Sequence, residues 1–318
     1  MTPLRISVLG GTGFIGSHLV HRLSSLGHQV AIVTRRPERH REFKLDRSLE
    51  LVQCSLTDLD SLTTLFRRTD CVINLIGILN ETGNSRFQDA HVEIPRNVVK
   101  AMRETGTRRL LHMSALNADV NESRSMYLKT KGEGEDLVHN TPGLSVTSFR
   151  PSVIFGRGDS FFNRFASLLR SAPPVFPLAC PKARFAPVFV GDVVKAFTRA
   201  LDREQTAGQR LELCGPASYS LQQLVTYTAE VIGRKTLVTG LPDFASRLQA
   251  RMLGLVPGKP FSIDNYYSLQ KDSVCRESAL SGLGIRPQSV EAIVPTYLGN
   301  RNYRARYNQY RAEARRDD

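Results

Sequence analysis

The sequence lacks the long apolar runs of a membrane-spanning protein. No run in the chain approaches the roughly 18 consecutive apolar residues that a transmembrane helix needs. The first five residues, Met1–Arg5, lead directly into an apolar segment, so we expect neither a secretion signal nor a transit peptide. These features predict a cytoplasmic protein, with peripheral attachment at the inner face of a membrane as the alternative.

Cysteine is scarce, and its spacing argues against a disulfide framework. The five cysteines are widely separated and form no C-x-x-C pair: Cys54, Cys71, Cys180, Cys214 and Cys275. An odd, scattered set in a chain without a secretion signal predicts reduced thiols. The seven histidines form no H-E-x-x-H pattern and no other ligand cluster, so we expect no metal site.

Positive charge is in excess. Lysine and arginine number 43 against 30 aspartate and glutamate, which gives a formal net charge of +13. Such an excess suits a phosphate-bearing ligand, an anionic lipid surface or nucleic acid. The basic residues gather in two segments, Arg35–Arg47 and Arg301–Arg316, which bear on the cofactor and on a partner.

Short apolar runs and amphipathic segments alternate through the first 150 residues. The segment Phe14–Leu26 has helical spacing and is followed by Gly27, which is typical of a helix end. Runs of strand length lie at Ile6–Leu9, Val30–Val33, Leu51–Cys54, Cys71–Leu75, Leu110–Met113 and Val146–Phe149. This alternation predicts an α/β fold, a Rossmann-type doubly wound parallel sheet with helices on both faces.

The rhythm changes after Pro151. A proline-rich loop precedes a strand-like segment, Pro187–Val190, and an apolar helix that we expect to begin at Asp192. Ser220 and Gln223 have the spacing of a capping box. We predict a Rossmann core of residues 1–155 to which residues 186–214 return, a smaller and mainly helical substrate-side region of residues 156–185 and 215–300, and a basic tail of residues 301–318.

A glycine-rich turn follows the first strand and opens the first helix. Here Gly10 suits the tight turn, Gly13 lets the backbone approach a pyrophosphate, and Gly16 lets helix and strand pack closely. The free N–H groups of the helix start would then bind the phosphates. The strand–turn–helix context distinguishes the motif from an ordinary turn. The expected cofactor contacts in it are Gly10, Thr12, Gly13, Phe14, Ile15 and Gly16.

The second strand ends in Thr34, Arg35 and Arg36, where an NAD-specific site usually carries a carboxylate for the ribose 2′-hydroxyl. Arginine is instead the natural partner of a 2′-phosphate. We therefore expect these residues to bind NADP(H) in preference to NAD(H), with a solvated basic loop as the alternative. Leu75, Ile76 and Gly77 follow the fourth strand, where a small residue would let the chain pass close to the adenosine or merely form a turn.

Tyr127 and Lys131 are four residues apart, so on a helix they share a face. A nearby ammonium is expected to lower the tyrosine pKa toward the working range of an acid–base catalyst. Ser114, at the end of the fifth strand, could orient a substrate oxygen. The predicted catalytic residues are therefore Tyr127, Lys131 and Ser114. An exposed helix face with an ordinary lysine is the alternative.

These motifs, together with several others, carry a family resemblance. The others are Phe87–Pro95, His112–Ala118, Arg150–Gly156, Phe161–Ala166 and Pro187–Asp192. The chain resembles the atypical short-chain dehydrogenase/reductases formed by the nucleotide-binding accessory subunits of mitochondrial complex I and their stand-alone bacterial relatives.

The resemblance implies a Rossmann domain with bound NADPH, held by Gly10, Gly13, Gly16 and Arg35, with Lys131 and Tyr127 beside the nicotinamide ribose. It also implies cofactor contacts at Arg150 and Pro151. Ala115 and Ser55 depart from the pattern of related dehydrogenases, which carry a second Ser/Thr and an aspartate at these positions.

Two functions follow as alternatives. One is an NADP(H)-dependent oxidoreductase acting on a carbonyl, an alcohol or a quinone-related small molecule. The other is a non-catalytic NADPH-holding subunit, sensor or assembly factor of a membrane-associated respiratory complex. Tyr303, Tyr307 and Tyr310 lie among arginines in the tail, which suits a membrane surface, a larger complex or a solvated terminus. Nothing in the sequence resembles a nucleic-acid motif.

Overall fold

A computed structural model describes residues 2–83, 85–122, 124–256 and 261–299. Its centre is a seven-stranded sheet in the order β11-β6-β5-β4-β1-β2-β3, with every neighbouring pair parallel. The strands are β1 (Arg5–Leu9), β2 (Gln29–Thr34), β3 (Leu49–Gln53), β4 (Cys71–Asn74), β5 (Arg109–Met113), β6 (Ser145–Pro151) and β11 (Arg210–Leu213). The predicted doubly wound parallel sheet is confirmed.

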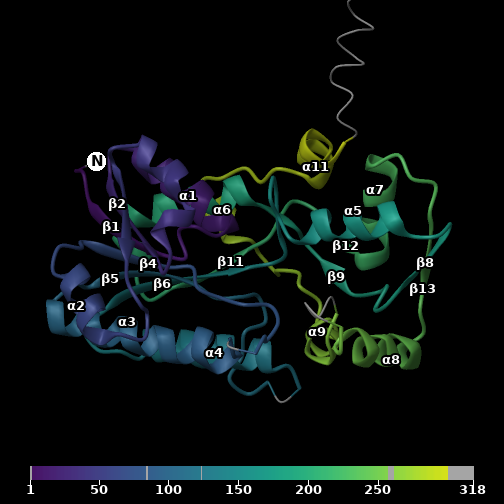
Figure 1. The fold of residues 1–318 in the computed structure, drawn as a ribbon, viewed down its shortest axis with the longest axis horizontal. Coiled ribbons are helices and arrows are strands. Elements are labelled where there is room, and N and C mark those ends of the chain that lie inside the picture. Colours follow the sequence, from purple (N-terminus) through teal and green to yellow (C-terminus); the bar gives the residue numbers. More distant parts are fainter. Residues whose placement is uncertain (1, 84, 123, 257–260, 300–318) are drawn as a thin grey trace, which may run out of the picture.

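Helices cover both faces of the sheet (Figure 1). On one face lie α1 (Phe14–Ser25) and α6 (Val190–Leu201), and on the other α2 (Leu59–Phe66), α3 (Ile94–Thr105) and α4 (Met126–His139). An apolar core lies between each face of the sheet and its helices. Because both faces are buried, the strand sequences are nearly continuous apolar runs. We call the sheet with these five helices the sheet region.

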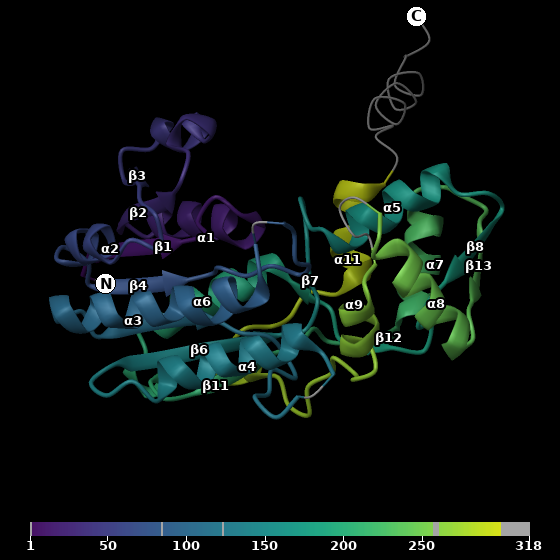
Figure 2. The same ribbon diagram turned by 60° about the horizontal axis from the view of Figure 1, so that its bottom comes forward.

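The remaining elements lie beside the carboxyl ends of the strands, at the right of Figures 1 and 2. The helices here are α5 (Phe161–Ser171), α7 (Leu221–Val231), α8 (Asp243–Leu253), α9 (Ile263–Ser268) and α11 (Val290–Leu298). Short strand pairs join them: β8 (Val175–Leu178) with β13 (Leu237–Gly240), and β9 (Arg184–Phe185) with β12 (Tyr219–Ser220). These elements, which we call the distal region, pack mainly around a separate apolar core.

Further short elements connect the two regions or flank the sheet. They are β7 (Ile154–Phe155), β10 (Val188–Phe189), α10 (Ala279–Gly282), the 3-10 turns η1 (Pro37–Arg39), η2 (Arg41–Leu45) and η4 (Glu204–Thr206), and a π-helical turn, η3 (Asp89–Glu93). No helix in the described ranges is both long enough and apolar enough to span a membrane. The tail residues Tyr303, Tyr307 and Tyr310 lie outside the described residues.

Several local predictions can be compared with the structure. The capping box at Ser220 and Gln223 is present at the start of α7. The apolar helix α6 begins at Val190 and not at Asp192, so that the Asp192 carboxylate lies inside the first turn, where it is buried. There it accepts hydrogen bonds from Lys195 Nζ at 2.9 Å and from the backbone N–H of Gln288 at 2.7 Å.

The expectation of five reduced thiols was wrong. Cys214, directly after β11, forms a disulfide with Cys275, 61 residues later in the chain. No local pattern indicates this pair, because the chain between the two cysteines builds much of the distal region before it returns to the sheet edge. Cys54, Cys71 and Cys180 remain thiols.

Candidate functional site

The glycine-rich turn joins β1 to α1. Gly10 has a φ of +81°, a left-handed conformation that favours glycine. A Cβ at Gly16 would lie 2.2 Å from the Gly10 carbonyl oxygen, so only glycine lets helix and turn approach this closely. The first turn of α1 has no side-chain cap and no acidic residue. Its backbone N–H groups are therefore available to an anion such as a pyrophosphate.

The position of this turn in the sheet supports the same interpretation. Strand β1 lies between β2 and β4, where the strand order reverses direction. In open parallel sheets, ligands bind outside the carboxyl ends of the strands at such a reversal. The turn, the end of β2 and the segment after β4 all lie at this edge.

Arg35 and Arg36 follow the end of β2 and are exposed. The backbone N–H of Arg36 donates to Thr34 Oγ1 at 3.3 Å, which closes the turn. Neither guanidinium forms an ion pair with any residue that the structure describes. Both side chains can therefore reach an anionic group at the edge of the sheet.

Lys131 is buried, with 5% of its surface exposed. Its ammonium donates to the carbonyl oxygens of Met113 at 3.0 Å and Ile76 at 3.4 Å, so it joins the ends of two neighbouring strands. A Cβ at Gly77 would lie 2.9 Å from Lys131 Nζ. The small residue after β4 thus makes room for this lysine. Burial lowers the pKa of Lys131 to about 8.

Tyr127 lies one turn before Lys131 on α4, and its ring packs edge-on against His91 and Phe87 at centroid distances of 5.6 and 6.0 Å. Burial raises its pKa to about 12. The expected lowering of this pKa was wrong for this structure. The reason is that the Lys131 ammonium donates to backbone carbonyls, while the phenol is removed from water.

Ser114 follows β5 directly. Its backbone N–H donates to the Phe149 carbonyl at 2.8 Å, and 3% of the residue is exposed. Its hydroxyl is the buried side-chain oxygen that has no hydrogen-bond partner within the described ranges. Because a buried polar group without a partner is costly, this hydroxyl indicates a place where a ligand oxygen can bind.

His91 was not among the predicted site residues. It lies in the π-helical turn η3, a geometry that often occurs at functional sites. Its Nε2 accepts a hydrogen bond from the Ile78 N–H at 3.1 Å, which assigns the proton of the neutral ring to Nδ1, 3.0 Å from Thr130 Oγ1. Burial lowers its pKa to about 2. The imidazole ring is therefore neutral, and it packs against the ring of Tyr127.

Asp264 was also missed, because it is 137 residues from Tyr127 in the chain. From α9 its carboxylate accepts hydrogen bonds from the backbone N–H of Met126 at 2.6 Å, from the N–H of Tyr127 at 3.3 Å and from Ser125 Oγ at 3.3 Å. An acidic side chain at a helix start stabilises the helix. The distal region thus caps the helix that carries Tyr127. No local sequence signal indicates this contact.

Arg150 has a structural partner. Its Nε lies 3.0 and 2.9 Å from the two carboxylate oxygens of Glu135, a fully buried residue of α4. Arg210 adds a second contact to this carboxylate at 3.5 Å. The guanidinium of Arg150 is therefore engaged in an ion pair. Any cofactor contact here would have to come from the backbone of Arg150 or from Pro151.

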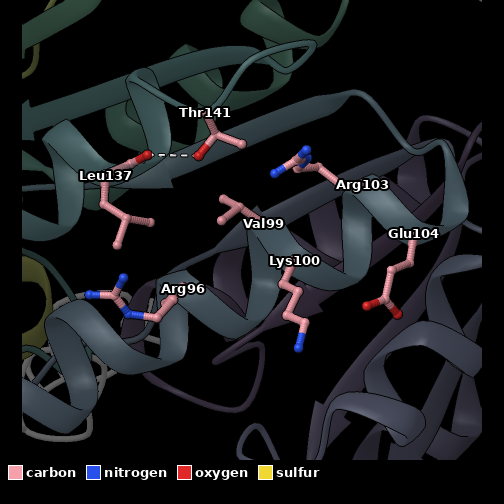
Figure 3. Close-up of a pocket in the computed structure, with 7 residues that line it drawn as sticks. All are labelled: Arg96, Val99, Lys100, Arg103, Glu104, Leu137 and Thr141. Carbon is pink, nitrogen blue, oxygen red and sulfur yellow. Dashed lines mark hydrogen bonds between the residues drawn. The ribbon is translucent and has the colours of Figure 1, made fainter.

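A hollow of about 560 Å³ lies elsewhere, on the outer surface of α3 and α4 (Figure 3). Its lining residues are Arg96, Val99, Lys100, Arg103, Glu104, Leu137 and Thr141. Thr141 and Glu104 lie at the carboxyl ends of the two helices, away from the strand ends that carry Ser114 and Gly10. The hollow is separate from the candidate site. Within the described parts of the chain, no cluster of His, Cys, Asp or Glu could hold a metal ion.

Comparison with curated proteins gives relatives over most of the chain. Subunit 9 of the NADH dehydrogenase [ubiquinone] 1 alpha subcomplex from Mus musculus is 32% identical over 293 residues, covering 90% of this chain and 77% of that protein. The 40 kDa subunit of NADH-ubiquinone oxidoreductase from Neurospora crassa is 28% identical, covering 95% and 80%. A protein named ceramide reductase from Caulobacter vibrioides is 29% identical, covering 75% and 74%. The resemblance to complex I accessory subunits is confirmed.

Solved structures share the fold. MoeE5 in complex with UDP-glucose and NAD superimposes with a TM-score of 0.72 at 19% identity, covering 96% of this chain and 99% of that one. DesIV, a dTDP-glucose 4,6-dehydratase from Streptomyces venezuelae, gives 0.71 at 19%, covering 96% and 98%. The sequence model of the NAD dependent epimerase/dehydratase family matches residues 6–214, which hold the glycine-rich turn, Ser114, Tyr127 and Lys131. The chain belongs to this family.

Proposed function

We propose that the protein is an NADP(H)-dependent oxidoreductase that acts on a carbonyl or alcohol group of a hydrophobic or quinone-related small molecule. The observation that carries the proposal is the buried Ser114 hydroxyl without a partner, next to the Met113 carbonyl that Lys131 binds. A buried hydroxyl at the strand ends is suited to bind a substrate oxygen.

The residues present fit a dinucleotide. The turn from Gly10 to Gly16 has the backbone shape and the free N–H groups that a pyrophosphate needs. A side chain at Gly16 would clash with the backbone of Gly10 and Gly11 and so disturb this shape. The exposed guanidinium groups of Arg35 and Arg36 would bind the 2′-phosphate of the adenosine ribose. Lys131 would bind the nicotinamide ribose. The nicotinamide, when bound, supplies or accepts the hydride.

The protonation states favour reduction of a carbonyl. With a pKa of about 12, the Tyr127 phenol is protonated at neutral pH and is therefore able to give a proton to a substrate oxygen. Lys131, with a pKa of about 8, is mainly charged at pH 7 and would stabilise the phenolate left behind. Ser114 would orient the same oxygen by a hydrogen bond.

The activity is tested with purified protein, NADPH and a panel of quinones, aldehydes, ketones and a ceramide. We expect NADPH oxidation with one class of compound, and a loss of about 100-fold or more in Tyr127→Phe, because a positioned acid contributes about that factor. Tyr227→Phe, a tyrosine of α7 outside the site, is the matched control and should retain the activity. Absence of oxidation with every compound would contradict the proposal.

The cofactor preference is tested separately by calorimetry. Arg35→Asp should weaken NADPH binding by about tenfold or more while it changes NADH binding much less, because one charge-assisted contact contributes about 1.5–3 kcal/mol. Arg41→Asp, in the same basic segment, is the control for a general charge effect. Equal weakening of both cofactors by Arg35→Asp would contradict the assignment to the 2′-phosphate.

A second candidate is an NADPH-holding subunit of a membrane-associated respiratory complex that does not turn over. One structural observation favours it: Lys131 is bound to backbone carbonyls and Tyr127 is not activated, so the pair could serve only to hold the ribose. The relatives named as complex I subunits point the same way. Tight NADPH binding without oxidation, unchanged in Tyr127→Phe, would support this function.

A further inference from the structure

Helix α8 of the distal region carries an exposed apolar strip. Phe244, Leu248 and Met252 are four residues apart and 76%, 55% and 62% exposed, and Leu255 follows just beyond the helix at 88%. At 3.6 residues per turn the three helical side chains lie along one side of α8. Single large apolar side chains are common at a surface, whereas a row of three along one helix, continued by a fourth just beyond its end, indicates an interaction site.

The opposite side of α8 is already packed. Ser246 and Ala250 are buried, and Ser246 Oγ accepts a hydrogen bond from the Cys180 N–H at 3.1 Å. Asp243 accepts one from Tyr266 of α9 at 2.8 Å. The helix is thus held in place by its buried side, and α8 and α9 lie side by side in both views (Figures 1 and 2). The strip lies on the solvent-exposed side of α8 and is not needed to hold the helix in place.

Two arginines flank the strip. Arg247 and Arg251 are exposed, one turn apart, and lie next to the apolar side chains around the helix. Neither forms an ion pair with a residue in the described part of the chain. The single acidic residue of α8 is Asp243, at the first position of the helix. The surface is therefore apolar along its centre and positive along one side.

We propose that the strip on α8 is a docking site for an anionic lipid surface. A helix lying on a membrane inserts its apolar side chains below the headgroups, while arginines beside them reach the lipid phosphates. A twofold pairing of two copies through the strip would instead place the arginines of each copy close together. The chain's own C-terminal segment fits no better, because it is rich in arginine. The charge of the strip thus favours lipid phosphate.

Docking through α8 would hold the distal region at the lipid surface. Because α9 packs on α8 and its Asp264 caps α4 beside Tyr127, the candidate site is connected to the docked helix through α9. The proposal does not depend on the oxidoreductase activity, because it concerns a different surface and is measured without a substrate.

The test is co-sedimentation of the full chain with vesicles of phosphatidylcholine alone and of phosphatidylcholine with one-third phosphatidylglycerol. We expect binding to the anionic vesicles and a loss of about tenfold or more in a triple variant, Phe244→Ser with Leu248→Ser and Met252→Ser. The control is Leu45→Ser in η2, beside the sheet, which replaces a leucine that is 90% exposed. Because all these side chains are exposed, circular dichroism should show unchanged folding.

The second variant, Arg247→Glu with Arg251→Glu, reverses the flanking charge and should weaken binding to the anionic vesicles, with a smaller effect at high salt. Retention of full binding by the triple variant would overturn the proposal, because the basic tail alone would then account for the binding. The proposal would also be overturned if the full chain did not bind vesicles but formed a dimer that was lost in the triple variant. The strip would then be an interface with a second copy.

Discussion

The sheet region and the distal region differ in how they are held together. In the sheet region, each strand pairs with a parallel neighbour, and helices cover both faces over continuous apolar cores. In the distal region, helices surround a single core and are joined by two-stranded pairs, and α8 leaves apolar side chains in solvent. The first region is a regular frame that places the candidate site at the strand ends. The second is irregular and leaves more of its apolar side chains at the surface.

The two regions also differ in their buried polar groups. All seven histidines lie in the first 139 residues, and His91 and His112 are buried and neutral. The distal region has no histidine. It contributes instead a carboxylate, Asp264, whose pKa is raised by burial, to the first turn of α4. The regions should therefore respond differently to mutation and to acid.

The largest expected effect concerns the tight packing of the sheet region. Gly16→Ala would place a Cβ 2.2 Å from the Gly10 carbonyl oxygen and 2.6 Å from the Gly11 Cα, both backbone atoms that cannot easily move. We expect a loss of about 3 kcal/mol in the free energy of unfolding, measured by urea denaturation, because overpacking of this kind costs about 1–3 kcal/mol or more. Loss of cofactor binding should accompany it.

The matched control is Gly282→Ala in α10, where no heavy atom lies within 4 Å of the added Cβ. This variant should change the free energy of unfolding by less than about 0.5 kcal/mol. Similar losses in both variants would mean that the contrast between close and open packing does not determine stability here.

An intermediate effect is expected from acid. Burial lowers the pKa of His91 to about 2 and of His112 to about 3, below the ordinary value of 6.5. Below pH 6.5 the unfolded chain therefore binds protons that the folded chain does not. The free energy of unfolding decreases as the pH is lowered. From about pH 7 to pH 5, each histidine should cost about 2 kcal/mol of unfolding free energy.

Urea unfolding at the two pH values measures this loss. His112→Asn should reduce the difference between them, because it removes one of the buried histidines. If hydrogen exchange showed that the distal region opens first in acid, the histidines of the sheet region would not be the cause.

The smallest effect on stability is expected at Ser114. Because its hydroxyl has no partner within the described residues, Ser114→Ala should change the free energy of unfolding by less than about 0.5 kcal/mol. The same variant should lower turnover by about tenfold or more with whichever carbonyl compound proves to be a substrate. The control is Ser152→Ala, which removes hydroxyl hydrogen bonds to Ser273 at 2.6 Å and to the Ala186 N–H at 3.2 Å and should destabilise the fold. A stability loss at Ser114 equal to that at Ser152 would contradict the assignment.

Much of the sheet region could be predicted from the sequence. Its strands are apolar runs and its helices have apolar spacing, so local patterns determine the element order, and the glycine-rich turn lies where it was expected. The third strand, predicted at Leu51–Cys54, begins two residues earlier and spans Leu49–Gln53. The proximity of Lys131 to the ends of β4 and β5 follows from helix spacing and sheet order together.

The remaining features of the site depend on contacts that local patterns do not encode. The sequence shows that Tyr127 and Lys131 share a helix face, but not that backbone carbonyls bind the lysine. Asp264 reaches α4 from a helix 137 residues later. Cys214 meets Cys275 only because the intervening chain folds as it does. Burial, which determines the pKa values of Tyr127 and His91, is likewise a property of the assembled protein.

The disulfide closes a covalent ring in the chain. The ring includes α7, β13, α8 and α9. It begins at Cys214, directly after β11, and ends at Cys275. A single protease cut within the ring would therefore yield two fragments that separate only after reduction. The strip of α8 and the Asp264 cap of α4 both belong to this ring, so the surface proposed to meet lipid and the residue that touches the Tyr127 helix remain tied to the sheet by two covalent attachments.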